Sequence, residues 1–328
     1  MIKKVTMSVI LLGSMFIMMW CTSNRQAISH NTQGVHLHNQ GAYIEAIAQF
    51  EQAIELNPTL TEAHYNKGLS HFSLGEFQLA LESYENALHI DPDYYLAMAD
   101  KGLTLTQLGR FDDAHKTFNQ VIERDPENIY ALNNQGYTRY MMWKYSDAIQ
   151  RYDEALAIDP TFVKAVANKG VALADSWSLS EAILYFDRAI ELAPDNFLHY
   201  YNKWTVLSDL WFDTQDREVS QRALEILEQA IELNPLFVDA YVYKAMTYYD
   251  LEEFENAREW GAVAVDIDET FENAWFYLAL ALEELELHEE AIVAYQQLLE
   301  INPNHVYAGD ALADLLESDL YDGSDRWW

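Results

Sequence analysis

Histidine and acidic side chains are the groups in this 328-residue sequence whose spacing comes nearest to that of a metal or proton-transfer site. His64 and His71 are seven residues apart, which puts them on one face of a helix but about 10 Å apart along its axis. That separation is too long for two ligands of one metal ion. His36 and His38 are two residues apart and point to different sides of a helix. We therefore interpret these histidines as packing or surface residues.

Motifs for catalysis or nucleotide binding are missing from the sequence. It contains no G-x-G-x-x-G, Walker, G-x-S-x-G or H-E-x-x-H pattern. Cys21 is the one cysteine, which excludes cysteine-rich zinc sites and an intrachain disulfide. We predict that the protein is not an enzyme and holds no cofactor or metal.

A unit of 34 residues, most regular over residues 61–94, organises the rest of the chain. Apolar residues recur at i, i+3, i+4 and i+7 in each half of this unit, which predicts two amphipathic helices. Gly75 lies in the turn between the halves, and Pro92 ends the second half because proline cannot continue a helix. Prolines recur at 34-residue intervals at Pro58, Pro92, Pro126, Pro160 and Pro194, then after 41 residues at Pro235 and after two more 34-residue steps at Pro303. Such a period indicates stacked repeats.

Five positions of each unit make the chain resemble the tetratricopeptide repeat (TPR), with its pattern of Gly or Ala, Ala, aromatic, Ala and Pro. The clearest copies are Gly68-Ala80-Tyr84-Ala87-Pro92, Gly102-Ala114-Phe118-Val121-Pro126, Gly136-Ala148-Tyr152-Ala155-Pro160 and Gly170-Ala182-Phe186-Ala189-Pro194. The resemblance covers roughly residues 27–316. It implies an all-α fold, an α-solenoid that winds as a right-handed superhelix of about eight repeats with a C-terminal capping helix. In it the first helix of each repeat lines a concave groove.

Small residues at these positions also have a physical reason. They lie where the two helices of a repeat would cross, so that the backbones can approach closely while the aromatic rings fill the space beside them. Repeats two to five span residues 61–196, repeat six spans 197–237, and repeats seven and eight span 238–305. In repeats seven and eight, Ala245 and Ala279 take the place of the glycine.

Asparagines and aromatic residues recur at the positions that face the groove in the TPR family, which are positions 2, 5, 6, 9, 12 and 13 of each repeat. Amide side chains can pair with an extended peptide backbone, and tyrosines add contact area with a polar tip. The alternative is that the amides link adjacent repeats. The resemblance places these residues in the groove: Tyr65, Asn66, Leu69, Phe72, Asn133, Asn134, Tyr137, Tyr140, Asn168, Tyr201 and Asn202.

Position 13 becomes acidic in the second half of the array. Four consecutive repeats carry a carboxylate there: Asp175, Asp209, Asp250 and Glu284. Stacked carboxylates would focus negative potential at one edge of the groove, which favours a basic peptide segment or a cation as ligand. The alternative is an ordinary solvated acidic surface.

Lysines form a second column, usually just before the small residue. We expect each to lie along the stack and to pair with a carboxylate of the preceding repeat. The column is Lys67, Lys101, Lys169, Lys203 and Lys244.

The net charge of −33, from 53 acidic and 20 basic residues, argues against nucleic acid as a partner. Acidity of this size supports solubility and disfavours nonspecific binding to anionic membranes.

Residues 1–21 differ from the repeats and are predicted to be a signal peptide or membrane anchor. Lys3 and Lys4 precede an apolar run of 16 residues, and Cys21 follows at once. The run is short for a spanning helix but suits a signal-peptide core. Cys21 resembles the lipidated cysteine of bacterial lipoproteins, although Trp20 before it is larger than that pattern requires. Lipoprotein, uncleaved anchor and ordinary secretion all remain open, and each places the repeats outside the cytoplasm, in the cell envelope or the exterior.

The remaining boundaries follow from the repeats. We predict a polar linker over 22–26, the solenoid over 27–317, a seven-residue insertion near 210–220, and an acidic flexible tail over 318–328 that ends in Trp327-Trp328. Seven residues are close to two helical turns, so both helices of repeat six could lengthen by one turn and keep their register. Exposed aromatic residues in the insertion would either dock a partner or extend the local core.

The expected function is that of a protein-interaction scaffold, attached to a membrane through its N-terminus. It would bind partner proteins or peptides in its groove, with basic ones favoured by the carboxylates at position 13, and it resembles envelope TPR lipoproteins that assist assembly. The second hypothesis is a small-ligand-binding or transport-associated TPR protein. A closed aromatic pocket around Tyr137, Tyr140 and Tyr201 would favour the second, and an open groove the first.

Overall fold

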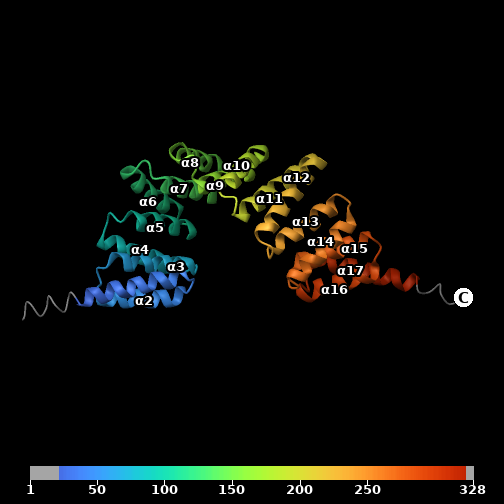
Figure 1. Cartoon of the computed structure of the whole chain (residues 1–328), viewed down its shortest axis with the longest axis horizontal. Coiled ribbons are helices and arrows are strands. Elements are labelled where there is room, and N and C mark those ends of the chain that lie inside the picture. The colour runs from blue at the N-terminus through green and yellow to red at the C-terminus, as the bar shows by residue number, and fades with distance from the viewer. Residues whose placement is uncertain (1–21, 323–328) are drawn as a thin grey trace, which may run out of the picture. The chain divides into compact units, whose positions relative to one another are not determined.

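The computed structural model describes residues 22–322 and contains helices and turns, with no strand in that range (Figure 1). The prediction of an all-α solenoid is confirmed. A helix over residues 22–39 comes first. It is followed by α2 (Tyr43–Leu56), α3 (Thr61–Ser73), α4 (Phe77–Ile90), α5 (Tyr95–Gln107), α6 (Phe111–Arg124), α7 (Ile129–Met141), α8 (Tyr145–Ile158), α9 (Val163–Asp175), α10 (Leu179–Leu192), α11 (Phe197–Thr214), α12 (Arg217–Leu233), α13 (Val238–Asp250), α14 (Phe254–Ile267), α15 (Glu272–Glu284), α16 (His288–Ile301) and α17 (Val306–Asp322).

Two compact units divide the chain, one up to Ala165 and the other from Val166. Within each unit, the two helices of a repeat pack on each other and the second helix packs on the first helix of the next repeat. None of the helices over residues 22–322 is long and apolar enough to cross a membrane.

The turn inside each repeat requires a left-handed residue. Gly75 has φ +75°, and the amide of Glu76 then donates to the carbonyl of His71, at 2.9 Å, to close the helix. Glycine adopts this conformation without a Cβ clash. In later repeats the same position is held by residues with side chains, such as the exposed Trp143 and Trp177, each at φ 61°.

Close contact between a glycine and an aromatic ring defines the core of the first five repeats. A Cβ atom on Gly68 would lie 2.5 Å from Cε1 of Tyr84, and one on Gly170 would lie 2.9 Å from Cε1 of Phe186. Those rings are almost fully buried. The repeating Gly and aromatic positions of the sequence are therefore two halves of one steric fit. The other pairs are Gly34 with Phe50, Gly102 with Phe118, and Gly136 with Tyr152.

Repeat six reverses this arrangement of sizes. Trp204 stands where the glycine is expected, 34 residues after Gly170, and Leu227 stands in the aromatic position. Both side chains are buried, and Trp204 stacks on Tyr243 of the next repeat with ring centroids 4.0 Å apart. In repeat seven the aromatic position is Gly261, where a Cβ atom would lie 3.1 Å from the backbone of Leu278.

The insertion in repeat six lengthens both helices, as predicted. α11 has 18 residues and α12 has 17, against 13 and 14 in α13 and α14 of the next repeat. Phe212 at the end of α11 is 78% exposed, and Arg217 at the start of α12 donates to Glu253 of repeat seven at 2.6 Å. The insertion therefore exposes one aromatic ring and also contacts the next repeat.

The N-terminal boundary differs from the prediction. Residues 22–26, predicted as a linker, are already helical. Ala27 is fully buried, and Asn57 donates its amide to Oδ1 of Asn24 at 2.7 Å, so this turn packs against the first repeat. At the other end α17 continues to Asp322, past the predicted end of the solenoid at residue 317. The predicted signal segment 1–21 with Cys21, and residues 323–328, lie outside the described residues.

Candidate functional site

The first helices of four successive repeats form a pocket in the unit that ends at Ala165. Its volume is about 290 Å³. Leu96, Asp100 and Leu103 share one face of α5 because they lie four and three residues apart. Neighbouring faces of α3, α7 and the start of α9 complete the wall. The lining residues are Tyr65, Tyr95, Leu96, Ala99, Asp100, Leu103, Asn128, Tyr130, Asn133, Asn134 and Lys164.

Asp100 is the carboxylate of this pocket. It accepts a hydrogen bond from the hydroxyl of Tyr65, at 2.8 Å. Burial raises the pKa of Asp100, while the hydrogen bond from Tyr65 and the positive charge of Lys164 act in the opposite direction. Burial and the charge of Asp100 in turn raise the pKa of Tyr65. The phenol therefore stays protonated and acts as the hydrogen-bond donor to Asp100. A cationic group entering the pocket would offset part of the cost of burying this carboxylate.

Amide groups lie beside the carboxylate. Asn133 is buried, and its Nδ2 donates to Oδ1 of Asn134 at 3.1 Å. Asn128 caps α7, since its Oδ1 accepts from the amide of Ala131 at 2.9 Å. Asn133 and Asn134 therefore present an ordered pair of amides to the pocket, which is the chemistry that can pair with a peptide main chain.

Exposed apolar and aromatic side chains surround these polar groups. Tyr95, Leu96 and Tyr130 are 44%, 58% and 57% exposed. The ring of Tyr130 meets Phe162 edge to face, with centroids 5.1 Å apart, which holds it in place. The pocket thus combines one carboxylate, one ammonium group, amides and exposed rings.

The sequence predicted part of this pocket and missed the rest. Tyr65, Asn133 and Asn134 were predicted to line the groove, and the structure brings them together. Asp100 and Lys164 were missed, as were Leu96 and Tyr130. A signal was present, because Leu96, Tyr130 and Lys164 occupy position 2 of their repeats and Asp100 occupies position 6.

Other predicted groove residues of this unit serve the stack itself. Asn66 donates to Oδ1 of Asn31 at 3.0 Å, across the interface between repeat one (residues 27–60) and repeat two. For Asn66 the alternative interpretation, an amide that links adjacent repeats, describes the contact. Phe72 is partly buried beside Phe77, with centroids 5.3 Å apart.

Tyr137 and Tyr140 stack on each other, with ring centroids 6.4 Å apart. Tyr137 also accepts from Nε2 of Gln107 at 3.3 Å, and Tyr140 lies against Tyr145. Neither tyrosine is among the residues that line the pocket around Asp100.

The second unit contains the remaining predicted residues. Tyr201 lies between Trp204 and Phe237, and its hydroxyl is 3.5 Å from that of Tyr243. Asn168 and Asn202 are half-buried on α9 and α11. The aromatic side chains around Tyr201 pack on one another and form part of the repeat interface.

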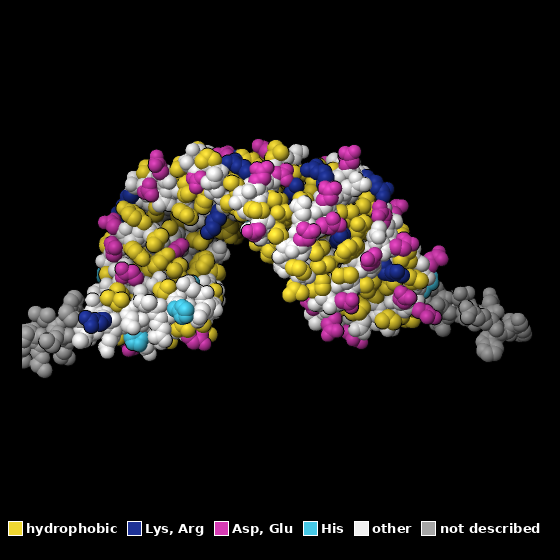
Figure 2. Space-filling model, in the orientation of Figure 1, with side chains coloured by type: hydrophobic (Ala, Val, Ile, Leu, Met, Phe, Trp, Pro, Cys, Tyr) yellow, Lys and Arg dark blue, Asp and Glu magenta, His cyan; other side chains and the backbone are white. Residues whose placement is uncertain are grey.

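The four predicted carboxylates have different environments. Asp175, Asp209 and Glu284 are exposed. Burial and the neighbouring charge of Asp175 raise the pKa of Asp209, so these two carboxylates lie close enough to repel. Burial alone raises the pKa of Asp250 to about 6, and Glu284 accepts from the hydroxyl of Tyr249 at 3.3 Å. Figure 2 shows acidic side chains scattered over the visible surface of both units.

Metal ligands do not cluster in the part of the chain that the structure describes. No group of three or more His, Cys, Asp or Glu side chains there is placed to hold a metal ion. His71 bonds Glu76 at 2.6 Å, and His64 lies 3.0 Å from the carbonyl of Pro58.

The lysine column forms the predicted ion pairs at Lys67, Lys101, Lys203 and Lys244. Each of the four contacts the carboxylate 16 residues earlier, in the second helix of the preceding repeat. Lys169 also donates to the hydroxyl of Tyr185 at 2.7 Å. The ion pairs are Lys67 with Glu51 at 2.7 Å, Lys101 with Glu85 at 2.8 Å, Lys203 with Asp187 at 2.5 Å and Lys244 with Glu228 at 2.9 Å.

Comparison with protein families found tetratricopeptide repeats along most of the chain. Models described as tetratricopeptide repeat match residues 61–94 and 272–305, and also 99–141, 142–197 and 216–270, and a further TPR repeat model matches 36–75. Together these matches cover more than half of the chain. No curated protein matches the sequence.

Solved structures share the fold at low sequence identity. A tetratricopeptide repeat protein from Parabacteroides merdae has 20% identity and a TM-score of 0.55, covering 79% of this chain and 99% of its own. PilF of Pseudomonas aeruginosa has 17% identity and a TM-score of 0.52, covering 71% and 99%. The Cut9–Hcn1 hetero-tetramer of the APC/C contains a chain with 17% identity and a TM-score of 0.54, covering 84% and 52%.

Proposed function

Because the chain belongs to the tetratricopeptide repeat family, whose members are in general protein-interaction scaffolds, we propose that it is a non-enzymatic scaffold that binds an extended peptide segment of a partner protein. The binding site is the pocket around Asp100, and the segment carries a lysine or arginine side chain. The observation that carries the proposal is the partly buried Asp100 carboxylate, which lies among amides and exposed rings.

Each part of the pocket has a separate role in this proposal. Asp100 attracts the cationic side chain and already has one of its oxygens ordered by Tyr65. Asn133 and Asn134 pair with the peptide main chain, since an amide both donates and accepts. Tyr95 and Tyr130 supply exposed contact area at low entropic cost. Lys164 opposes a cationic guest and limits how many positive charges the segment can bring.

One of the structural neighbours was solved together with a second protein. The chain in the Cut9–Hcn1 hetero-tetramer is one that assembles with a second protein. At 17% identity, the structural likeness shows a shared fold and no more. The partner of the present protein is therefore inferred from the chemistry of its own pocket.

Binding can be tested with three pools of fluorescein-labelled decapeptides, each with Lys, Asp or Leu fixed at the centre. We expect the full chain to bind the Lys pool best. Asp100→Asn should weaken this binding about tenfold or more, because a hydrogen bond to a charged group contributes about 1.5–3 kcal/mol. Lys164→Met should strengthen it, since it removes a repelling charge.

Glu123→Gln is the matched control for Asp100→Asn. Glu123 is exposed on α6 and does not line the pocket. The same loss of one negative charge at Glu123 should leave binding of the Lys pool nearly unchanged. Equal effects of the two substitutions, or equal binding of all three pools, would contradict the proposal.

The proposal also places the scaffold outside the cytoplasm, anchored through Cys21 and acting in assembly of the cell envelope. The support is the sequence of residues 1–21, with two lysines, an apolar run and a cysteine. Cys21→Ala should leave an unprocessed precursor of higher mass and move the protein out of the lipid-modified membrane fraction. Unchanged mass and fractionation would contradict the lipoprotein hypothesis. The peptide-binding assay would still test the pocket around Asp100, because it does not depend on the lipid anchor.

A further inference from the structure

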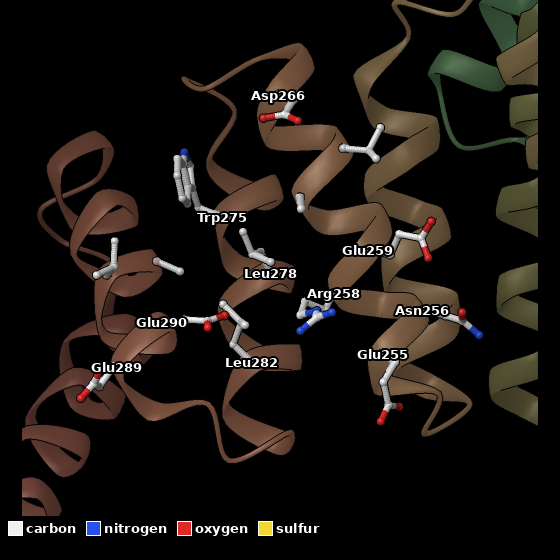
Figure 3. A pocket seen from close by; sticks show the side chains of 14 residues that line it. Glu255, Asn256, Arg258, Glu259, Asp266, Trp275, Leu278, Leu282, Glu289 and Glu290 are labelled. Carbon is white, nitrogen blue, oxygen red and sulfur yellow. The ribbon is translucent and has the colours of Figure 1, made fainter.

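A second groove, of about 930 Å³, lies in the unit that begins at Val166, between the second helices of repeats seven and eight. α14 and α16 form its walls, and α15 lies between them (Figure 3). Trp275, Leu278 and Leu282 project from α15 into the groove, at i, i+3 and i+7. This apolar floor extends about 10 Å along the helix.

The groove exists because three side chains that fill the preceding interface have been replaced. One repeat earlier, Lys244 pairs with Glu228 at 2.9 Å and lies 3.7 Å from the ring centroid of Trp260. These three residues bridge α12, α13 and α14. The positions 34 residues later are Leu278, Ala262 and Ala294, and all three line the groove. An ion pair and an indole ring have thus given way to one leucine and two methyl groups.

The rim of the groove is acidic. Arg258 is its one basic residue, and Asn256 its one neutral polar side chain. The acidic side chains stand on both walls: Glu255, Glu259 and Asp266 on α14, and Glu289 and Glu290 on α16. A ligand that covers the floor would therefore be flanked by negative charge on two sides.

Trp275 is fixed as part of the floor. Its Nε1 donates to the carbonyl of Glu269 at 2.8 Å, in the turn where the repeated proline has been lost. A held indole offers a flat apolar face and attracts cations through its π-system. Tryptophan is also enriched among residues that dominate binding energy at interfaces.

We propose that this groove binds an amphipathic helix of a partner protein, with an apolar stripe and lysine or arginine on both flanks. The helical period of the floor matches a guest helix whose apolar side chains recur at i, i+3 and i+7. Long basic side chains on its flanks reach the carboxylates while their methylene groups cover the rim. Charge complementarity, five carboxylates against one guanidinium, selects a basic partner over an acidic one.

The probe that tests this inference is a 16-residue helical peptide of leucine and lysine with all leucines on one face. Two companions serve as controls, one with glutamate in place of lysine and one with the same composition in scrambled order. Binding to the full chain is measured by fluorescence anisotropy at low and high salt. We expect the amphipathic basic peptide to bind at least tenfold tighter than either companion, and its affinity to fall with salt.

The double variant Ala262→Glu with Leu278→Lys rebuilds the ion pair that repeat seven already tolerates, and it leaves the net charge unchanged. We expect it to weaken binding at least tenfold while far-UV circular dichroism stays the same. Unchanged affinity in this variant would overturn the proposal, and so would equal binding of the scrambled peptide.

A second pair of variants separates the groove from the general acidity of the chain. Replacing Glu255, Glu259, Glu289 and Glu290 with Gln should weaken binding and flatten its salt dependence. The control changes four exposed acids of the first unit to Gln: Glu45, Glu55, Glu123 and Glu127. Equal losses in both quadruple variants would mean nonspecific attraction and would overturn the proposal. A wild-type dimer that dissociates when the ion pair is rebuilt would instead identify a second copy of this chain as the occupant.

Discussion

Gly68 and Tyr84 meet so closely that a single added carbon atom would collide: a Cβ on Gly68 would lie 2.5 Å from Cε1 of the ring. Gly68→Ala should therefore lower the free energy of unfolding by about 1–3 kcal/mol, the usual cost of overpacking a core. Urea denaturation measures the change. Gly309→Ala is the control, since apart from its own stretch of helix backbone nothing lies within 4 Å of the added carbon. It should stabilise α17 by about 0.5–1 kcal/mol, because alanine favours a helix over glycine. A neutral Gly68→Ala would disprove the steric fit.

The hydroxyl of Tyr84 is buried and has no hydrogen-bond partner among the described residues, whereas that of Tyr295, at the same position of repeat eight, donates to Glu283 at 2.6 Å. Tyr84→Phe should therefore raise the free energy of unfolding by about 1 kcal/mol, since it removes an unsatisfied polar group. Tyr295→Phe should lower it by about 1 kcal/mol or more, because it breaks a bond to a charged acceptor. Chemical denaturation of both variants tests the contrast, and effects of the same sign would contradict it.

The reversed sizes at Trp204 and Leu227 predict a coupled pair of substitutions. Trp204→Gly should destabilise the protein by about 4 kcal/mol through the cavity that it leaves. Leu227→Tyr alone should cost about 1–3 kcal/mol, because the ring would meet Trp204. Together the two changes restore the glycine and tyrosine of repeats two and four. The double variant should lose less stability than the sum of the single variants, and strict additivity would show that the two positions do not share a volume.

Asp250 should make stability depend on pH. Burial raises its pKa from 3.8 to about 6 in the folded protein. Below 3.8 the carboxyl is neutral in both states and folding carries no penalty. As the pH rises through 6, the desolvated Asp250 carboxyl of the folded state has to ionise. The stability that came from keeping this carboxyl neutral in the folded state is then lost. Asp250→Asn should therefore raise the unfolding free energy at pH 8 and change it little at pH 4.

Asp268→Ala is the opposite control for this experiment. Hydrogen bonds from the Thr270 hydroxyl and amide lower the pKa of Asp268, so its contribution is present above the unfolded pKa and lost as the pH falls. Removing it should lower stability at pH 8, with a smaller effect at low pH. Carbon-13 NMR titration of Asp250 should give a midpoint near 6, and a midpoint near 4 would contradict the burial argument.

The repeated fold could be predicted because each repeat states the same constraint again. The pattern of Gly68, Tyr84 and Pro92 recurs in the same register in several repeats, so the prediction does not depend on a chance match to the pattern in any one repeat. The lysine ion pairs could be predicted for the same reason, since each lysine faces the second helix of its own preceding repeat. The lengthening of α11 and α12 followed from the near match between seven residues and two turns.

The candidate sites were harder to predict because they depend on departures from the repeat. Asp100 looks like one surface acid among 53 until the structure places it beside Tyr65 and partly buries it. The groove over Leu278 requires that three repeat positions differ from the preceding repeat at the same time, at residues 262, 278 and 294. Each of these differences alone gives no signal in the sequence. Residues 22–26 were misjudged because their polar side chains concealed the packing of Ala27 and the bond between Asn24 and Asn57.

Repeat six has a large side chain, Trp204, at the glycine position and a smaller one, Leu227, at the aromatic position. This has a consequence for how recombination can change the number of repeats. In repeats two to five the glycine and the ring that it meets belong to the same repeat, so deleting or duplicating one whole repeat among them would leave each of these contacts intact. Repeat six is different, because Trp204 stacks on Tyr243 in repeat seven and needs that neighbour. We therefore expect repeats six and seven to be kept together when the number of repeats changes, so that any change in the length of the array falls elsewhere.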